Sequence, residues 1–114
     1  MSRSTTRAAI IILTLITAAV HLIVLNFQMG QLDLLFTLNG LGYLGLLGLY
    51  LIRPAFLATQ NTLLYGVYIL FTIATIVAFF IFGSMSDMLG WATKVVEVLL
   101  ILALVMEMRA RDEV

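Results

Sequence analysis

The sequence predicts an all-α membrane protein, a single domain of residues 1–114 folded as an antiparallel up-down-up-down bundle of four transmembrane helices. Hydrophobic residues make up 63% of the chain and charged residues 11%, whereas a soluble domain carries about a quarter charged residues. The apolar residues form four runs of about 20 residues, the length that crosses a hydrocarbon core. Short connections between the runs force neighbouring helices to run in opposite directions. The runs are Ala8–Phe27, Leu34–Ile52, Leu63–Phe82 and Leu89–Met108.

The first two runs carry small residues at helical spacing. Thr14, Thr17, Ala18 and His21 follow the spacing i, i+3, i+4, i+7 in the first run. This spacing places them on one helix face, which is expected to point into the bundle because it is small and polar.

The second run contains a glycine at every third position. Gly42, Gly45 and Gly48 predict a helix-packing face, because small residues let helix backbones approach closely in lipid. The same smooth face could instead admit a lipid, a ligand or a quinone tail. The run is expected to end before Pro54, since a proline disfavours helical geometry in the residue that precedes it.

Side chains of the remaining runs give further expectations. The Thr72 and Thr75 hydroxyls are expected to bond back to their own helix. Tyr50 and Tyr65 are expected to anchor the helices at the inner membrane interface, and Trp91 at the outer one.

The basic residues predict the orientation in the cell membrane. Five of the six basic residues lie at the two termini or in the second connection, whereas Asp33 and Asp87 flank or occupy the other two connections. Because basic residues favour the cytoplasmic side, both the N- and the C-terminus are expected in the cytoplasm. The five residues are Arg3, Arg7, Arg53, Arg109 and Arg111.

Four polar residues inside the runs are taken as the candidate site. His21, Asn39, Lys94 and Glu97 all fall in the outer half of the predicted bundle, so their side chains can converge. Each charge near a helix centre costs roughly 2.5–3.5 kcal/mol on insertion scales, which favours an ion pair between Lys94 and Glu97, three residues apart. Alternatively, Glu97 is protonated, or Lys94 extends to the interface along the helix.

Several function classes are not expected. The chain has no cysteine and one histidine, so no metal site, haem or other cofactor is expected. No nucleophile–base pair or phosphate-binding loop is present, which argues against an enzyme. The formal net charge is zero, which argues against a nucleic-acid partner.

Short motifs in each run resemble those of a group of small four-span membrane proteins from archaea and some bacteria. The resemblance covers nearly the whole chain, and it implies a four-span fold without a known function. The motifs are His21-Leu22, Leu38-Asn39-Gly40-Leu41-Gly42-Tyr43-Leu44, Leu64-Tyr65, and Thr93-Lys94 with Glu97.

The predicted function is that of a small polytopic membrane protein without enzymatic activity. Its expected partner is the lipid bilayer, and it would act as an accessory or interaction subunit of a larger complex, or as a homo-oligomer. One alternative is a conduit or sensor for protons, ions or a small ligand, built on the polar cluster. Another is a binder of a lipophilic cofactor such as quinone. A water-filled pocket that reaches Glu97 from the outer side would favour the conduit or sensor. A dry, packed contact between the helices would favour the accessory or interaction role.

Overall fold

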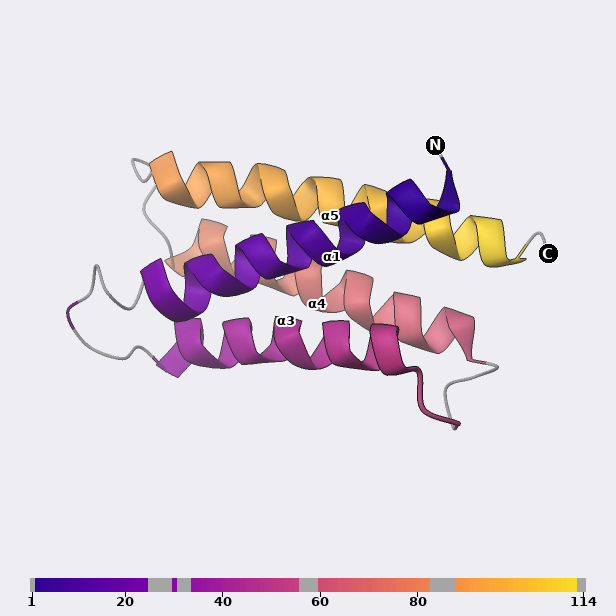
Figure 1. Ribbon diagram of the computed structural model, residues 1–114. Coiled ribbons are helices and arrows are strands. Elements are labelled where there is room, and N and C mark those ends of the chain that lie inside the picture. Colours follow the sequence, from indigo (N-terminus) through magenta and orange to yellow (C-terminus); the bar gives the residue numbers. More distant parts are fainter. Residues whose placement is uncertain (1, 25–29, 31–33, 56–59, 83–87, 113–114) are drawn as a thin grey trace.

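The computed structural model describes residues 2–24, 30, 34–55, 60–82 and 88–112. Within these ranges the chain is helical apart from short terminal and connecting segments (Figure 1). The elements are α1 (Arg3–Ala19), the π-helical turn η1 (Val20–Val24), α3 (Leu34–Ile52), α4 (Asn61–Phe82) and α5 (Met88–Asp112).

The described chain contains four helical segments that are long and apolar enough to cross a membrane, as the sequence predicted. α1 packs most extensively on α5 and also contacts α3, whereas α4 packs mainly on α5 and touches α3 over a smaller area. The start of α1 and the end of α5 lie at the same end of the bundle (Figure 1). α1 and α5 therefore form the main seam of the bundle.

The first helix starts earlier than the hydrophobic pattern predicts, at Arg3 instead of Ala8. Ser2 caps it, because its hydroxyl accepts a hydrogen bond from the Thr5 backbone N–H at 3.2 Å. The helix then widens into η1, and the predicted end at Phe27 lies outside the described residues. α3 has the predicted bounds.

The end of α3 is held by an arginine in the left-handed backbone region. Arg53 has φ +48° and precedes Pro54, and its backbone N–H still bonds the Leu49 carbonyl at 2.8 Å. This conformation costs an L-residue roughly 1–2 kcal/mol. Side-chain contacts offset the cost: the Arg53 guanidinium bonds the Asn61 amide oxygen and lies 5.6 Å from the centre of the Tyr65 ring.

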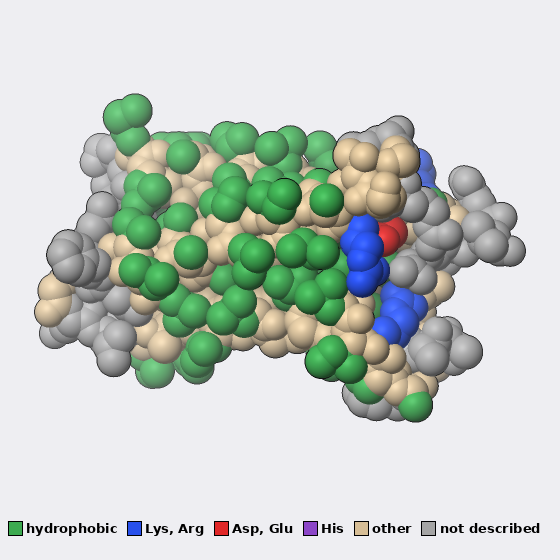
Figure 2. Space-filling view, viewed as in Figure 1, with side chains coloured by type: hydrophobic (Ala, Val, Ile, Leu, Met, Phe, Trp, Pro, Cys, Tyr) green, Lys and Arg blue, Asp and Glu red, His purple; other side chains and the backbone are tan. Residues whose placement is uncertain are grey.

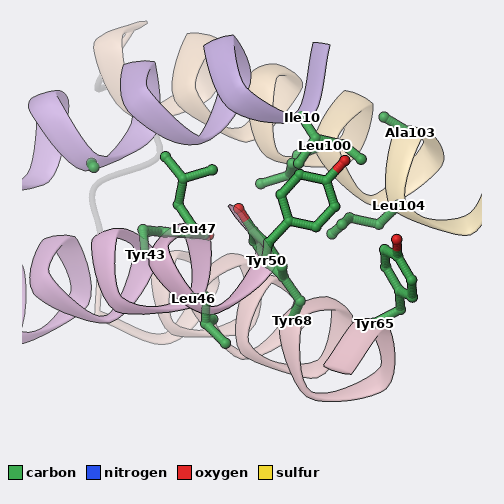
Figure 3. Close-up of a cluster of buried hydrophobic side chains, with 11 residues drawn as sticks. Ile10, Tyr43, Leu46, Leu47, Tyr50, Tyr65, Tyr68, Leu100, Ala103 and Leu104 are labelled. Atoms are coloured by element: carbon green, nitrogen blue, oxygen red, sulfur yellow. The ribbon is translucent and has the colours of Figure 1, made fainter. Parts of the chain in front are cut away.

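Polar aromatic side chains line the interior, and aliphatic side chains cover the outside. Tyr43, Tyr65 and Tyr68 are fully buried in the core (Figure 3). Large aliphatic residues such as Ile52 and Leu70 are exposed by 79% and 67%. Figure 2 shows this apolar surface along the length of the bundle, with Lys, Arg, Asp and Glu side chains gathered at one end.

The interface-anchor prediction was wrong for two tyrosines. Tyr50 is 2% exposed and Tyr65 is fully buried, and both point into the bundle (Figure 3). Their hydroxyls donate to the buried Glu107 carboxylate, and a buried tyrosine hydroxyl usually finds such a partner. Trp91 is 42% exposed and packs edge-on against Phe79.

The glycine-packing prediction needs correction at two positions. A Cβ at Gly42 would overlap the Phe71 ring, but a Cβ at Gly45 or Gly48 would meet nothing within 4 Å. The other close approach on α3 is at Gly40, where a Cβ would overlap Leu22 and lie 3.1 Å from the Ala18 carbonyl oxygen. A period of three drifts around a helix of 3.6 residues per turn, so the later glycines turn away from the neighbouring helices.

A matched pair of glycine substitutions on α3 tests this packing. Gly40→Ala should lower the free energy of unfolding by about 1–3 kcal/mol, because the added methyl group overpacks the contact with α1 and η1. Gly45→Ala should leave it unchanged or raise it by up to about 1 kcal/mol, since alanine favours the helix. Denaturation in detergent followed by circular dichroism measures both. Equal stability of the two variants would contradict the assignment.

Candidate functional site: two buried carboxylates on α5

The Glu97 carboxylate is fully buried and joins three helices. Its Oε2 accepts hydrogen bonds from the Thr17 hydroxyl of α1 and the Tyr43 hydroxyl of α3, each at 2.9 Å. Its Oε1 accepts no other hydrogen bond among the described residues and has the Lys94 ammonium of α5 as its counter-charge. The carboxylate is therefore matched in charge by its own helix and in hydrogen bonds by two others.

Lys94 is buried with it, so the alternative in which this side chain extends to the interface is wrong. The residue is 6% exposed, and its ammonium lies 5.5 Å from the centre of the Phe79 ring of α4. The aromatic face attracts the cation. Lys94 thus contributes to the contact between α5 and α4 as well as neutralising Glu97.

His21 joins the same group through Thr17. Its Nδ1 lies 2.8 Å from the Thr17 carbonyl oxygen and 3.4 Å from the Thr17 hydroxyl. A carbonyl only accepts, so Nδ1 carries the proton, and in the neutral ring the lone pair is on Nε2. His21 lies in η1, and π-helical turns are frequent at functional sites.

Asn39 bonds a threonine of α4. Its side-chain N–H₂ donates to the Thr75 hydroxyl at 2.6 Å, and that hydroxyl donates to the Phe71 carbonyl. The structure therefore brings His21, Lys94 and Glu97 together, whereas the hydrogen bond of Asn39 goes to α4.

A second buried carboxylate, Glu107, was missed by the sequence analysis. It is 3% exposed, and its Oε2 accepts hydrogen bonds from Tyr50 at 2.5 Å and Tyr65 at 3.1 Å. The Arg7 guanidinium lies 5.2 Å from the centre of the Tyr50 ring, and the Arg53 guanidinium lies over the Tyr65 ring. Residues from all four helices therefore meet around Glu107.

The spacing of α5 held a signal for this second site. Glu97, Leu100, Leu104 and Glu107 are all buried and follow the spacing i, i+3, i+7, i+10. Such spacing marks one face of a helix that packs on its neighbours. Glu107 also lies inside the run Leu89–Met108.

Comparison with known proteins places the whole bundle in one family. Residues 2–107 match the family of unknown function DUF7475. The chain belongs to this family. The matched range contains both carboxylates and all of their described partners. No curated protein and no solved structure matches the chain.

Metal ligands do not gather in the described part of the chain: it holds no group of three or more His, Cys, Asp or Glu side chains that could bind a metal ion. The chemistry that the site offers is that of hydroxyls, one imidazole, one ammonium and two carboxylates.

The Lys94–Glu97 pair can be tested by a double-mutant cycle. Lys94→Met should lower the free energy of unfolding by about 3–5 kcal/mol, because it leaves a buried carboxylate without its counter-charge. Lys94→Met combined with Glu97→Gln should recover much of this loss. Thermal unfolding in detergent measures the stability of the wild type, the two single variants and the double variant. Strictly additive losses would mean that the two side chains do not interact.

Proposed function

We propose that the chain is a small integral membrane protein whose helices form an antiparallel up-down-up-down transmembrane bundle. The distribution of side chains supports this proposal: carboxylates, an ammonium and hydroxyls are inside, and large aliphatic residues are outside. In water this arrangement would expose the apolar groups, whereas in lipid it satisfies both sets. The four long apolar segments have the required length.

We further propose that both termini lie in the cytoplasm. Arg7 and Arg53 lie around Glu107, at the end of the bundle where α1 begins and α5 ends. Figure 2 shows the charged side chains of its visible face at that end as well. Basic residues close to helix ends favour the cytoplasmic side of a membrane.

Reporter fusions test this orientation. A reporter that is active only in the cytoplasm should work when fused after Val114 and fail when inserted between residues 83 and 88. The physical reason is that the arginines near the termini and in the second connection stay on the cytoplasmic side when the helices insert into the membrane. The reverse pattern would contradict the orientation, and activity at both sites would contradict the four-span topology.

The role that the site supports best is a non-enzymatic one, as an accessory or interaction subunit or a homo-oligomer. One observation carries it: Glu97 is fully buried and bound within the chain by Thr17, Tyr43 and Lys94. A carboxylate held in this way acts as a clasp between helices. Because these polar groups are bound within the chain, contacts with other molecules would be made by the apolar outer surface.

Native mass spectrometry of the full chain, extracted from its own membranes with the surrounding lipid, tests this role. The expected result is an assembly of fixed stoichiometry, either of several copies or of the chain with a partner. A Lys94→Met variant should lose the assembly, because the bundle that presents the surface is destabilised. Extraction as a monomer in every preparation would contradict the proposal.

A further inference from the structure

Buried hydroxyl groups lie among the aliphatic core side chains between the two carboxylates of α5. Glu97 and Glu107 are ten residues apart, about 15 Å along the helix axis. Six hydroxyl-bearing side chains that lie between or beside them are at most 2% exposed. These residues, called here the hydroxyl column, are Thr14, Thr17, Tyr43, Tyr50, Tyr65 and Tyr68.

The column has three levels. At the first, Thr17 and Tyr43 donate to Glu97. At the second, the Thr14 and Tyr68 hydroxyls bond each other, and either oxygen can be the donor. Thr14 lies three residues from Thr17 on the same face of α1, a rise of about 4.5 Å.

The third level contains the two tyrosines that bind Glu107. The Tyr50 ring lies 6.5 Å from the Tyr68 ring and 6.1 Å from the Tyr65 ring, measured between ring centres. All three tyrosines lie in one region of the core (Figure 3). The hydroxyls of Tyr50 and Tyr65 donate to Glu107, so the column ends on a carboxylate at this end too.

We propose that the hydroxyl column is a proton-transfer path between Glu97 and Glu107. Packing alone does not require the middle level, because phenylalanine and valine would fill the space of Tyr68 and Thr14. Thr72 shows the ordinary alternative, since its hydroxyl donates to the Tyr68 carbonyl of its own helix. The Thr14–Tyr68 bond instead joins two helices and can reverse its direction, as a relay requires.

Each group along the column gains one proton and gives up another, so no net charge remains on any hydroxyl after the transfer. A proton that reaches Glu97 forms an O–H bond on the carboxylate, beside His21 and Lys94. The carboxyl group passes a proton to a hydroxyl oxygen, and that hydroxyl releases its own hydrogen to the next acceptor. Rotation of the hydroxyls or single water molecules link the levels. Glu107 takes up the last proton and releases it to water beside Arg7 and Arg53.

Proton flux into liposomes tests the path. The purified full chain is reconstituted with a pH-sensitive dye inside, and a potassium gradient with valinomycin drives protons inward. Wild-type vesicles should acidify faster than protein-free vesicles. Tyr68→Phe keeps the ring and removes the hydroxyl, and it should reduce the flux about tenfold or more, as loss of a proton-transfer group does. Glu107→Gln should reduce it similarly.

Thr93→Val is the matched control. Thr93 is also buried, but its hydroxyl donates to the Leu89 carbonyl of its own helix at 2.8 Å and lies outside the column. This variant should conduct like the wild type. Circular dichroism of each variant in the same vesicles shows whether the helices are retained, and a variant that loses them is replaced by Thr14→Val, which removes the partner hydroxyl.

Wild-type flux equal to that of protein-free vesicles would overturn the path, as would equal flux in Tyr68→Phe. An equal loss in Thr93→Val would show that the flux depends on the packing of the bundle and not on the hydroxyl column, and would also overturn the path. The path goes beyond the proposed accessory role and does not depend on it. A bundle that conducts no protons can still show coupled stability of Lys94 and Glu97 and a fixed stoichiometry.

Discussion

Burial of the Glu97 carboxylate is the constraint on which the rest of the bundle depends. An isolated charge in a low-dielectric interior is expensive, so every nearby element must supply something to it. α5 supplies Lys94, α1 supplies Thr17, and α3 supplies Tyr43. A rotation of any one of these helices would leave a charge or a hydroxyl unmatched, so the carboxylate sets their rotation about their own axes.

The second carboxylate extends the same logic to the other end of the bundle. α3 and α4 share the smallest of the main contacts between neighbouring helices. Tyr50 of α3 and Tyr65 of α4 both donate to Glu107, so α5 holds the two helices together without requiring a broad interface between them. α5 therefore contacts the other three helices through two polar groups, one around Glu97 and one around Glu107.

In the proposed membrane setting, several weak interactions would together stabilise such a bundle. Helices embedded in hydrocarbon gain no hydrophobic effect from meeting each other, and individual interhelical hydrogen bonds contribute on the order of 0.6 kcal/mol. Close backbone approach at Gly40 and the Phe71 ring packed on Gly42 add contact area, and edge-on ring pairs such as Tyr43 with Phe71 add more. The proposed proton path uses side chains that already serve this packing, so its conduction has to be separated from stability by substitutions that preserve shape.

The sequence by itself determined the number, approximate position and apolar character of the helices. These properties follow from local composition, because a run of about 20 apolar residues predicts a spanning helix whatever its neighbours are. The face of α1 that carries Thr14, Thr17 and His21 was also predictable, since helical spacing alone places these residues together. The proximity of Lys94 and Glu97 followed from the same rule.

Only the tertiary structure decided which side chains meet across helices. Glycine spacing on α3 predicted contacts at Gly42, Gly45 and Gly48, but of these only Gly42 makes one, and Gly40 makes another, because the positions of α1 and α4 select the face. Tyr50 and Tyr65 look interfacial in the sequence, yet a carboxylate on another helix draws their hydroxyls inward. Helix rotation and partner choice depend on residues far apart in the chain, and no local pattern encodes them.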